Sequence, residues 1–165
     1  MKQVIYKFKE EKEKIKNLIK FLKGDDKKIV FTNGCFDLLH VGHLRYLKKA
    51  KDLGDVLITG INSDQSVKKN KGKSRPIIQE KDRSELLSGL KPVDFVIVFE
   101  EKTPLSLIQE ISPDYLVKGG DWKVEDIVGS DHVISTGGEV KSIIFEKGFS
   151  STNIINKILN EGELQ

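Results

Sequence analysis

Two histidines three residues apart carry the strongest chemical signal in this sequence. His40 and His43 end the segment TNGCFDLLHVGH, residues 32–43, and Gly42 lies between them. An imidazole N–H donates hydrogen bonds to phosphate oxygens, and a glycine lets a ligand come close to the backbone. Both rings fall on the same side of a turn or of a first helical turn, so they can reach one phosphate. The spacing predicts a nucleotide-phosphate site with His40 and His43 as catalytic groups.

A metal pair and a pair of core histidines are the competing interpretations of this motif. Zinc usually needs a third or fourth ligand at a recognisable spacing. The chain has one cysteine, Cys35, and the remaining histidine, His132, is distant in sequence. We therefore predict no protein-built metal site. Cys35 is expected to be a small buried residue whose backbone lies at the site.

A strand and a helix must position the motif. Residues 28–31 form an apolar run that suits a buried strand, and helical spacing of apolar residues begins at Leu44. Such a turn points free backbone N–H groups and the positive end of a helix dipole at one spot. We expect the turn to bind the nucleotide through Thr32, Asn33, Gly34, Cys35, Phe36 and Gly42.

Strands and helices alternate along the rest of the chain. Further strands are predicted at residues 56–62, 95–98, 115–117 and 142–145, and helices at residues 82–90, from about 103 and from 151. The basic stretch 68–75 lacks apolar periodicity and is predicted to be a loop. This alternation is typical of an α/β fold, a doubly wound, Rossmann-like parallel sheet with helices on both faces. Its ligand site is expected at the carboxyl ends of the strands.

The composition indicates one ordinary core. The chain has 165 residues, of which 38% are hydrophobic. An amphipathic helix is predicted within residues 8–23, so we divide the chain into an appended helix, residues 1–26, and a main domain, residues 27–165.

A formal charge of +3 does not indicate nucleic-acid or membrane binding, and one cysteine excludes an internal disulfide. Because the start of the chain does not resemble a signal peptide, we expect a cytoplasmic enzyme.

The motif resembles the signature of the cytidylyltransferase-like nucleotidyltransferases. Within that superfamily, three further segments resemble the D-glycero-β-D-manno-heptose 1-phosphate adenylyltransferases: GKSRP at 72–76, LVKGGDW at 116–122 and GFSSTNII at 148–155. The likeness runs from about residue 27 to residue 159. It implies that residues 27–165 are a nucleotidyltransferase domain, without the kinase half of the bifunctional form. The implied reaction transfers AMP from ATP to heptose 1-phosphate and releases pyrophosphate, with Mg²⁺ arriving on ATP and a homodimer as the assembly.

The resemblance also implies roles for charged residues outside the motif. Lys71 and Arg75 match cations that clamp the phosphates, whereas Lys73 stands where related sequences often carry an acidic residue. Arg83 resembles an arginine that organises the phosphate site, and a surface ion pair is its alternative role. Asp37 is expected beside the phosphates or orienting neighbouring groups.

Two further segments complete the expected site. A nucleotide-recognition loop is implied for Lys118, Gly119, Gly120, Asp121 and Trp122, and a phosphate-binding element for Ser150, Ser151 and Thr152. Helix capping by these hydroxyl groups is the alternative for the second segment, although capping and phosphate binding use the same N–H groups. Asp64 is expected near the sugar, with capping again as the alternative.

Other functions remain open at the level of sequence. The same fold and motif would serve a glycerol-phosphate or ethanolamine-phosphate cytidylyltransferase, a pantetheine-phosphate adenylyltransferase or a flavin-nucleotide synthetase. A non-catalytic nucleotide-binding module is a further alternative, which predicts ATP binding without turnover.

Overall fold

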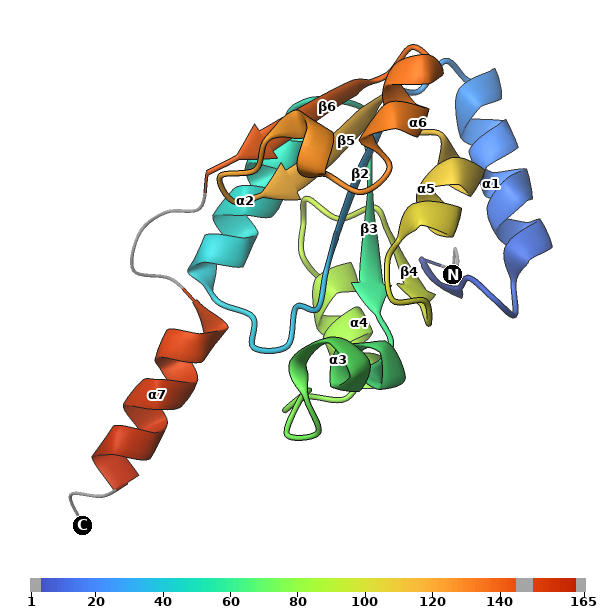
Figure 1. Cartoon of the computed structure of the whole chain (residues 1–165). Helices are drawn as coiled ribbons and strands as arrows, with labels where there is room; N and C mark the ends of the chain where they lie inside the picture. Colours follow the sequence, from blue (N-terminus) through green and yellow to red (C-terminus); the bar gives the residue numbers. More distant parts are fainter. Residues whose placement is uncertain (1–3, 145–149, 163–165) are drawn as a thin grey trace.

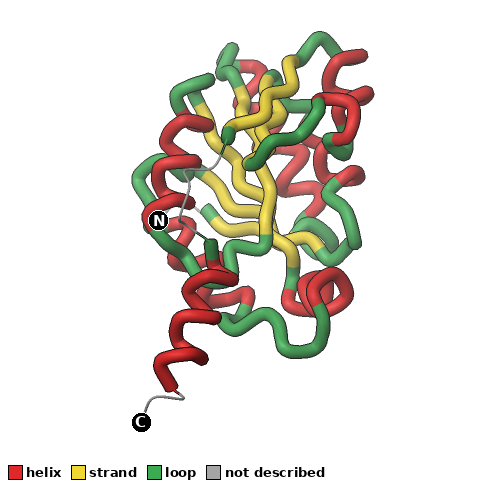
Figure 2. The backbone as a smooth tube through the Cα atoms, turned by 60° about the vertical axis from the view of Figure 1, so that its left-hand side comes forward, coloured by secondary structure: helices red, strands yellow, loops and turns green. Residues whose placement is uncertain are grey.

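The computed structural model describes residues 4–144 and 150–162, and these form a single parallel sheet covered by helices on both faces (Figures 1 and 2). The strands are β1 (Ile5–Lys7), β2 (Ile29–Gly34), β3 (Val56–Asn62), β4 (Phe95–Phe99), β5 (Tyr115–Gly119) and β6 (Glu139–Ile143). The helices are α1 (Lys12–Gly24), α2 (Val41–Lys51), α3 (Asp64–Lys71), α4 (Glu80–Ser88), α5 (Leu105–Ile111), the 3₁₀ helix η1 (Val124–Asp126), α6 (Ser130–Ser135) and α7 (Ser151–Gly162). The predicted doubly wound α/β fold is confirmed.

Successive side chains of the buried strands point to opposite faces of the sheet, so a separate core forms on each face. On β2, Phe31 packs with α1, α5 and α6, and Val30 packs with α2 and α4 on the other face. Both side chains are fully buried. Strands buried on both faces read as continuous apolar runs, which is why the central strands were visible in the sequence.

The order of the strands creates a crevice beside β2. The sheet runs β1-β4-β3-β2-β5-β6, so the chain winds from β2 toward β3 in one direction and toward β5 in the other. The β2–β5 pairing ends at Thr32 and Val117, beyond which the two strands part. Ligands of open α/β sheets bind at such a switch point, outside the carboxyl ends of the strands.

The N-terminal segment contributes more than the expected helix. β1 pairs with β4, with Ile5 opposite Val96, and was not predicted because three residues are too few to show a period. Helix α1 begins at Lys12 rather than near Phe8, and its Ile15 and Ile19 lie in the core. The division of the chain at residue 26 stays a prediction.

The prediction of a loop over residues 68–75 was wrong at its start. Helix α3 continues through Lys71, because the Ser63 side chain caps it by accepting a hydrogen bond from Ser66 N (3.2 Å) and Val67 is fully buried beneath it. Gly72, with φ of +96°, then ends the helix. A single buried apolar residue gives no visible periodicity, so the basic residues dominated the sequence pattern.

Smaller differences occur near the C-terminus. Strand β6 spans Glu139–Ile143 instead of residues 142–145, and Phe145 lies outside the described residues. Helix α6 and the 3₁₀ helix η1 were not predicted, since each is too short for its spacing to be recognised. Over the two described stretches, no helix is both long and apolar enough to cross a bilayer.

Candidate active site

A cavity of about 310 Å³ opens at the carboxyl ends of β2 and β5. The N-termini of α2 and α7 contribute residues to it, and so do the end of α3 and the segment that follows. Its lining residues are Asn33, Gly34, Cys35, Phe36, Asp37, His40, His43, Tyr46, Lys71, Arg75, Lys118, Gly119, Ser150, Ser151 and Thr152. Two helix N-termini with several cations and hydroxyl groups make this cavity suited to an anionic ligand.

The two histidines stack on each other at the start of α2. Their ring centroids are 3.9 Å apart, and His40 is the N-cap residue. The backbone N–H of His40 donates to Nδ1 of His43 (3.4 Å). A neutral His43 that accepts at Nδ1 carries its proton on Nε2, so Nε2–H is a hydrogen-bond donor.

The Phe36 ring also contacts the ring of His43. Its own ring lies 5.3 Å from that of His43, and it adopts a left-handed φ of +47°. Gly34 makes room for this turn, because a Cβ there would lie 3.0 Å from the Phe36 ring. A non-glycine residue in this conformation is strained and is typical of functional sites.

Burial disfavours the charged form of both histidines. Burial, followed by the charges of His40 and Lys71, lowers the pKa of His43 from 6.5 to about 4. Burial also lowers the pKa of His40. Charge on His43 is therefore disfavoured in the folded chain, which makes the ring a neutral donor at pH 7.

We predict that His43 stays a neutral Nε2–H tautomer in the free protein from pH 8 to about pH 5. Between pH 6.5 and 4 the unfolded chain binds a proton at His43 that the folded chain does not. The free energy of unfolding should therefore decrease as the pH falls through this range. Side-chain nitrogen NMR, with His43→Gln for assignment, measures the tautomer directly. A titration midpoint near 6.5 would contradict the prediction.

Asp37 and Arg75 are joined in a buried ion pair. The Asp37 side chain is 1% exposed and its Oδ2 accepts from Arg75 Nε, while Oδ1 accepts from the backbone N–H groups of Ile77 (2.8 Å) and Ile78 (2.9 Å). Of Asp37's two expected roles, this geometry matches the orientation of neighbouring groups. Arg75 lines the cavity, and its two Nη groups donate no hydrogen bond to any of the described residues.

We expect Asp37 to act through Arg75. Asp37→Asn should lower kcat/KM about 10-fold in the wild-type background and much less in an Arg75→Ala background, because the carboxylate has then lost the group it positions. A double-mutant cycle measures this coupling, and each variant's melting temperature reports on folding. Additive effects would show that Asp37 acts independently of Arg75.

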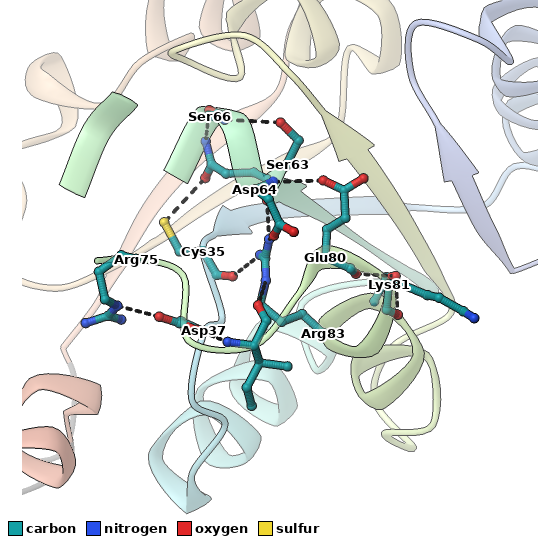
Figure 3. A network of polar contacts seen from close by, with 12 residues as sticks. Cys35, Asp37, Ser63, Asp64, Ser66, Arg75, Glu80, Lys81 and Arg83 are labelled. Carbon is teal, nitrogen blue, oxygen red and sulfur yellow. Dashed lines mark hydrogen bonds and ion pairs between the residues drawn. The ribbon is translucent and has the colours of Figure 1, made fainter. Parts of the chain in front are cut away.

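Arg83 is not among the residues that line the cavity, and it belongs to the network of polar contacts drawn in Figure 3. It is fully buried and donates four hydrogen bonds, to Ile78 O (2.9 Å), Cys35 O (2.5 Å), Asn62 O (3.0 Å) and Asp64 Oδ1 (2.7 Å). A surface ion pair is thus excluded for Arg83. Its four bonds join the ends of β2 and β3 to the segment that follows Arg75.

Several other predicted residues lie close to the cavity without lining it. Thr32 is buried, and its hydroxyl contacts that of Tyr46 at 2.5 Å. Gly42 is buried within α2, and Asp64 is bonded to Arg83. Cys35 lines the cavity but is only partly buried, contrary to expectation, and its thiol contacts Asn62 Oδ1 at 3.8 Å. Lys73 does not line the cavity either.

The predicted nucleotide-recognition loop, residues 118–122, is only partly in the cavity wall. Lys118 and Gly119 line the cavity, whereas Gly120, Asp121 and Trp122 do not. The Trp122 indole N–H donates to Gly119 O (3.1 Å) and the ring is 48% exposed. The predicted contact of this aromatic face with the nucleotide therefore stays a prediction.

The start of α7 completes the cavity. Ser150 caps the helix by accepting from Asn153 N (3.0 Å), and Ser151 Oγ donates to Leu38 O (3.0 Å). This bond ties α7 to the segment that follows β2, although the two are far apart in sequence. Gly148 and Phe149 of the GFSSTNII segment lie outside the described residues.

Tyr46 is the cavity residue that the sequence analysis missed. Its hydroxyl contacts Thr32 Oγ1 and donates to Val117 O (3.3 Å), so it bridges β2 and β5 where they part. Burial raises its pKa. In the sequence Tyr46 reads as one more apolar position of α2, and no local signal distinguishes it.

No group of three histidine, cysteine or acidic side chains within residues 4–144 and 150–162 is arranged to hold a metal ion. Asp37 is the single carboxylate among the residues that line the cavity, and both of its oxygens accept hydrogen bonds from the chain. The donor set therefore fits a divalent ion that is carried on the ligand's own phosphates, with water as its other ligand.

Comparisons with known proteins find relatives that are similar in sequence. The bifunctional protein HldE of Geobacter metallireducens is 55% identical over 152 residues, which are 88% of this chain and 31% of that protein. The HldE protein of Haemophilus ducreyi is 55% identical over 146 residues, with the same coverage of 88% and 31%. The chain thus spans about a third of the length of these curated relatives.

Solved structures and a family model match as well. A lipopolysaccharide core biosynthesis protein from Thermoplasma volcanium is 35% identical and superposes with a TM-score of 0.61, over 74% of this chain and 99% of that chain. Pantoate-beta-alanine ligase from Francisella tularensis, at 19% identity and a TM-score of 0.55 over 89% and 75% of the two chains, shares the fold. The family model described as cytidylyltransferase-like matches residues 31–157. The chain belongs to the cytidylyltransferase-like family.

Proposed function

We propose that this chain transfers AMP from ATP to D-glycero-β-D-manno-heptose 1-phosphate, forming ADP-heptose and pyrophosphate for lipopolysaccharide core or a related surface glycan. The observation that carries the proposal is the stacked pair His40 and His43 at the N-terminus of α2, which faces a cavity at the β2–β5 switch point. Choice of the heptose acceptor is supported by the segments at 72–76 and 116–122 and by the identity to HldE proteins.

The reaction needs charge stabilisation more than proton transfer. A phosphate oxygen of the acceptor, already anionic, attacks the α-phosphorus of ATP, the bond from that phosphorus to the α–β bridging oxygen breaks, and pyrophosphate leaves with the electron pair. Nε2–H of His43 donates to the oxygens on which charge develops. The Arg75 Nη groups and the N–H groups at the start of α7 bind the remaining phosphate oxygens.

The metal ion, the cellular location, the oligomeric state and the partners are proposals as well. Mg²⁺ would neutralise the β- and γ-phosphates, and no cavity carboxylate is needed to hold it. A cytoplasmic location, a homodimeric state and the absence of nucleic-acid partners remain expectations from the sequence and the resemblance.

Pyrophosphate release tests the proposal. ATP and CTP are each combined with Mg²⁺ and heptose 1-phosphate, glycerol 3-phosphate or phosphopantetheine. We expect turnover only with ATP and heptose 1-phosphate. Activity with CTP or another acceptor would overturn the substrate assignment, and ATP binding without turnover for any acceptor would favour a non-catalytic module.

A further inference from the structure

Lys118 places an ammonium group in the cavity, where no carboxylate of the described residues forms an ion pair with it. It lies near the end of β5, and its Nζ donates to Asn33 Oδ1 at 3.5 Å. Arg75 and Arg83, by contrast, are paired with Asp37 and Asp64.

This charge is unfavourable in the free protein. Burial lowers the pKa of Lys118 and the nearby Lys71 lowers it further, while the Cys35 thiol acts in the opposite direction. A partly buried cation whose hydrogen-bond partner is a neutral amide carries a desolvation cost, and no carboxylate among the described residues forms an ion pair that would offset it. An anionic ligand would offset it.

The position of Lys118 indicates which part of the ligand it meets. The cavity has an inner end, where Lys118 reaches Asn33 within β2 and Tyr46 bridges the parting strands. It has an outer end, where Ser151 reaches Leu38, beyond the end of β2. A triphosphate whose β- and γ-phosphates lie at the N-terminus of α7 points its α-phosphoryl group toward the inner end.

We propose that Lys118 is a further catalytic residue, whose ammonium group binds the non-bridging oxygens of the α-phosphoryl group during transfer. This rests on the proposed function and adds a role to it. The acceptor phosphate and the α-phosphoryl group are both anionic, and a cation at this point reduces their repulsion as they approach. The contact should strengthen in the transition state, so its loss should appear in kcat.

Three substitutions of Lys118 test the proposal. Lys118→Gln and Lys118→Met should each lower kcat about 100-fold while the KM for ATP changes less than about threefold. Lys118→Arg, which keeps the charge, should recover about a tenth of the wild-type kcat or more. Lys118→Met should also have a melting temperature equal to or above that of the wild type, because a partly buried unpaired charge is gone. Lys123→Gln, an exposed lysine outside the cavity, is the matched control and should keep wild-type kcat.

Sulfur substitution provides a readout that a purely structural role would not change. The wild type should discriminate between the two diastereomers of ATP thiolated at the α-phosphorus, and Lys118→Gln should lose about 10-fold of that discrimination. A kcat for Lys118→Gln within threefold of the wild type, or unchanged discrimination, would overturn the role of Lys118 and leave the proposed function standing. A wild type that releases no pyrophosphate with any acceptor would overturn both.

Discussion

Replacing His43 by alanine should lower kcat for pyrophosphate release at least about 100-fold while the fold stays intact. The Nε2–H donor of this ring is fixed by the hydrogen bond from His40 N to Nδ1 and by the flanking rings of His40 and Phe36. A preorganised donor of this kind acts on charge that develops in the transition state. Its loss should therefore affect turnover more than the binding of ATP.

Two further variants sharpen this experiment. His43→Gln retains an N–H donor near the position of Nε2 and should recover part of the lost rate. His132→Ala removes the histidine that is bonded to Ser112 outside the cavity, and it should keep wild-type turnover. Near-normal kcat in His43→Ala, measured under saturating substrates, would remove His43 from the mechanism.

Replacing Arg83 by methionine should lower the free energy of unfolding by about 3 kcal/mol or more. Methionine fills much of the same space, yet the Asp64 carboxylate and three backbone carbonyl groups lose their donor. Removing one partner of a buried charge pair is more costly than removing both, because the remaining charge is left uncompensated.

Urea unfolding measures this loss, and the same helix offers a control. Lys81→Met changes an exposed position on α4 and should alter stability by less than about 0.5 kcal/mol. Arg83→Met should also reduce activity, since two of its bonds hold Cys35, which lines the cavity, and Ile78, whose N–H donates to Asp37. An Arg83→Met protein as stable as the Lys81→Met control would show that the four hydrogen bonds contribute little.

The sequence predicted those parts of the molecule that depend on local patterns. The continuous apolar run of β3 was placed at its observed bounds, Val56–Asn62, because a strand buried on both faces needs no partner information to be recognised. The segment 32–43 was placed at a strand-to-helix turn because an apolar run precedes it and helical spacing of apolar residues begins at its end. The structure brings Asn33, His40 and His43 into one cavity, and their contacts with ATP stay predictions.

Contacts between distant segments could not be read from one sequence. The partner of Asp37 is 38 residues away, and Arg83 reaches Cys35 across 48 residues. Asp37 and Arg83 were both expected at the site by resemblance, but that Asp37 lines the cavity and Arg83 does not depends on how β2, β3 and α4 pack. Tyr46 was missed because its bridging hydroxyl matters only once β5 lies beside β2.

The most direct test of the central claim is phosphorus NMR of the reaction with heptose 1-phosphate labelled with oxygen-18 in its phosphate group. Adenylyl transfer predicts a diphosphate product in which label bridges the two phosphorus atoms, together with one unlabelled pyrophosphate per product. Attack at the γ-phosphorus would instead give a heptose diphosphate, also with bridging label, and release ADP, whereas attack at the β-phosphorus would give a heptose triphosphate and release AMP, and neither route forms free pyrophosphate. Either result, or ATP cleavage without a coupled diphosphate product, would contradict the account.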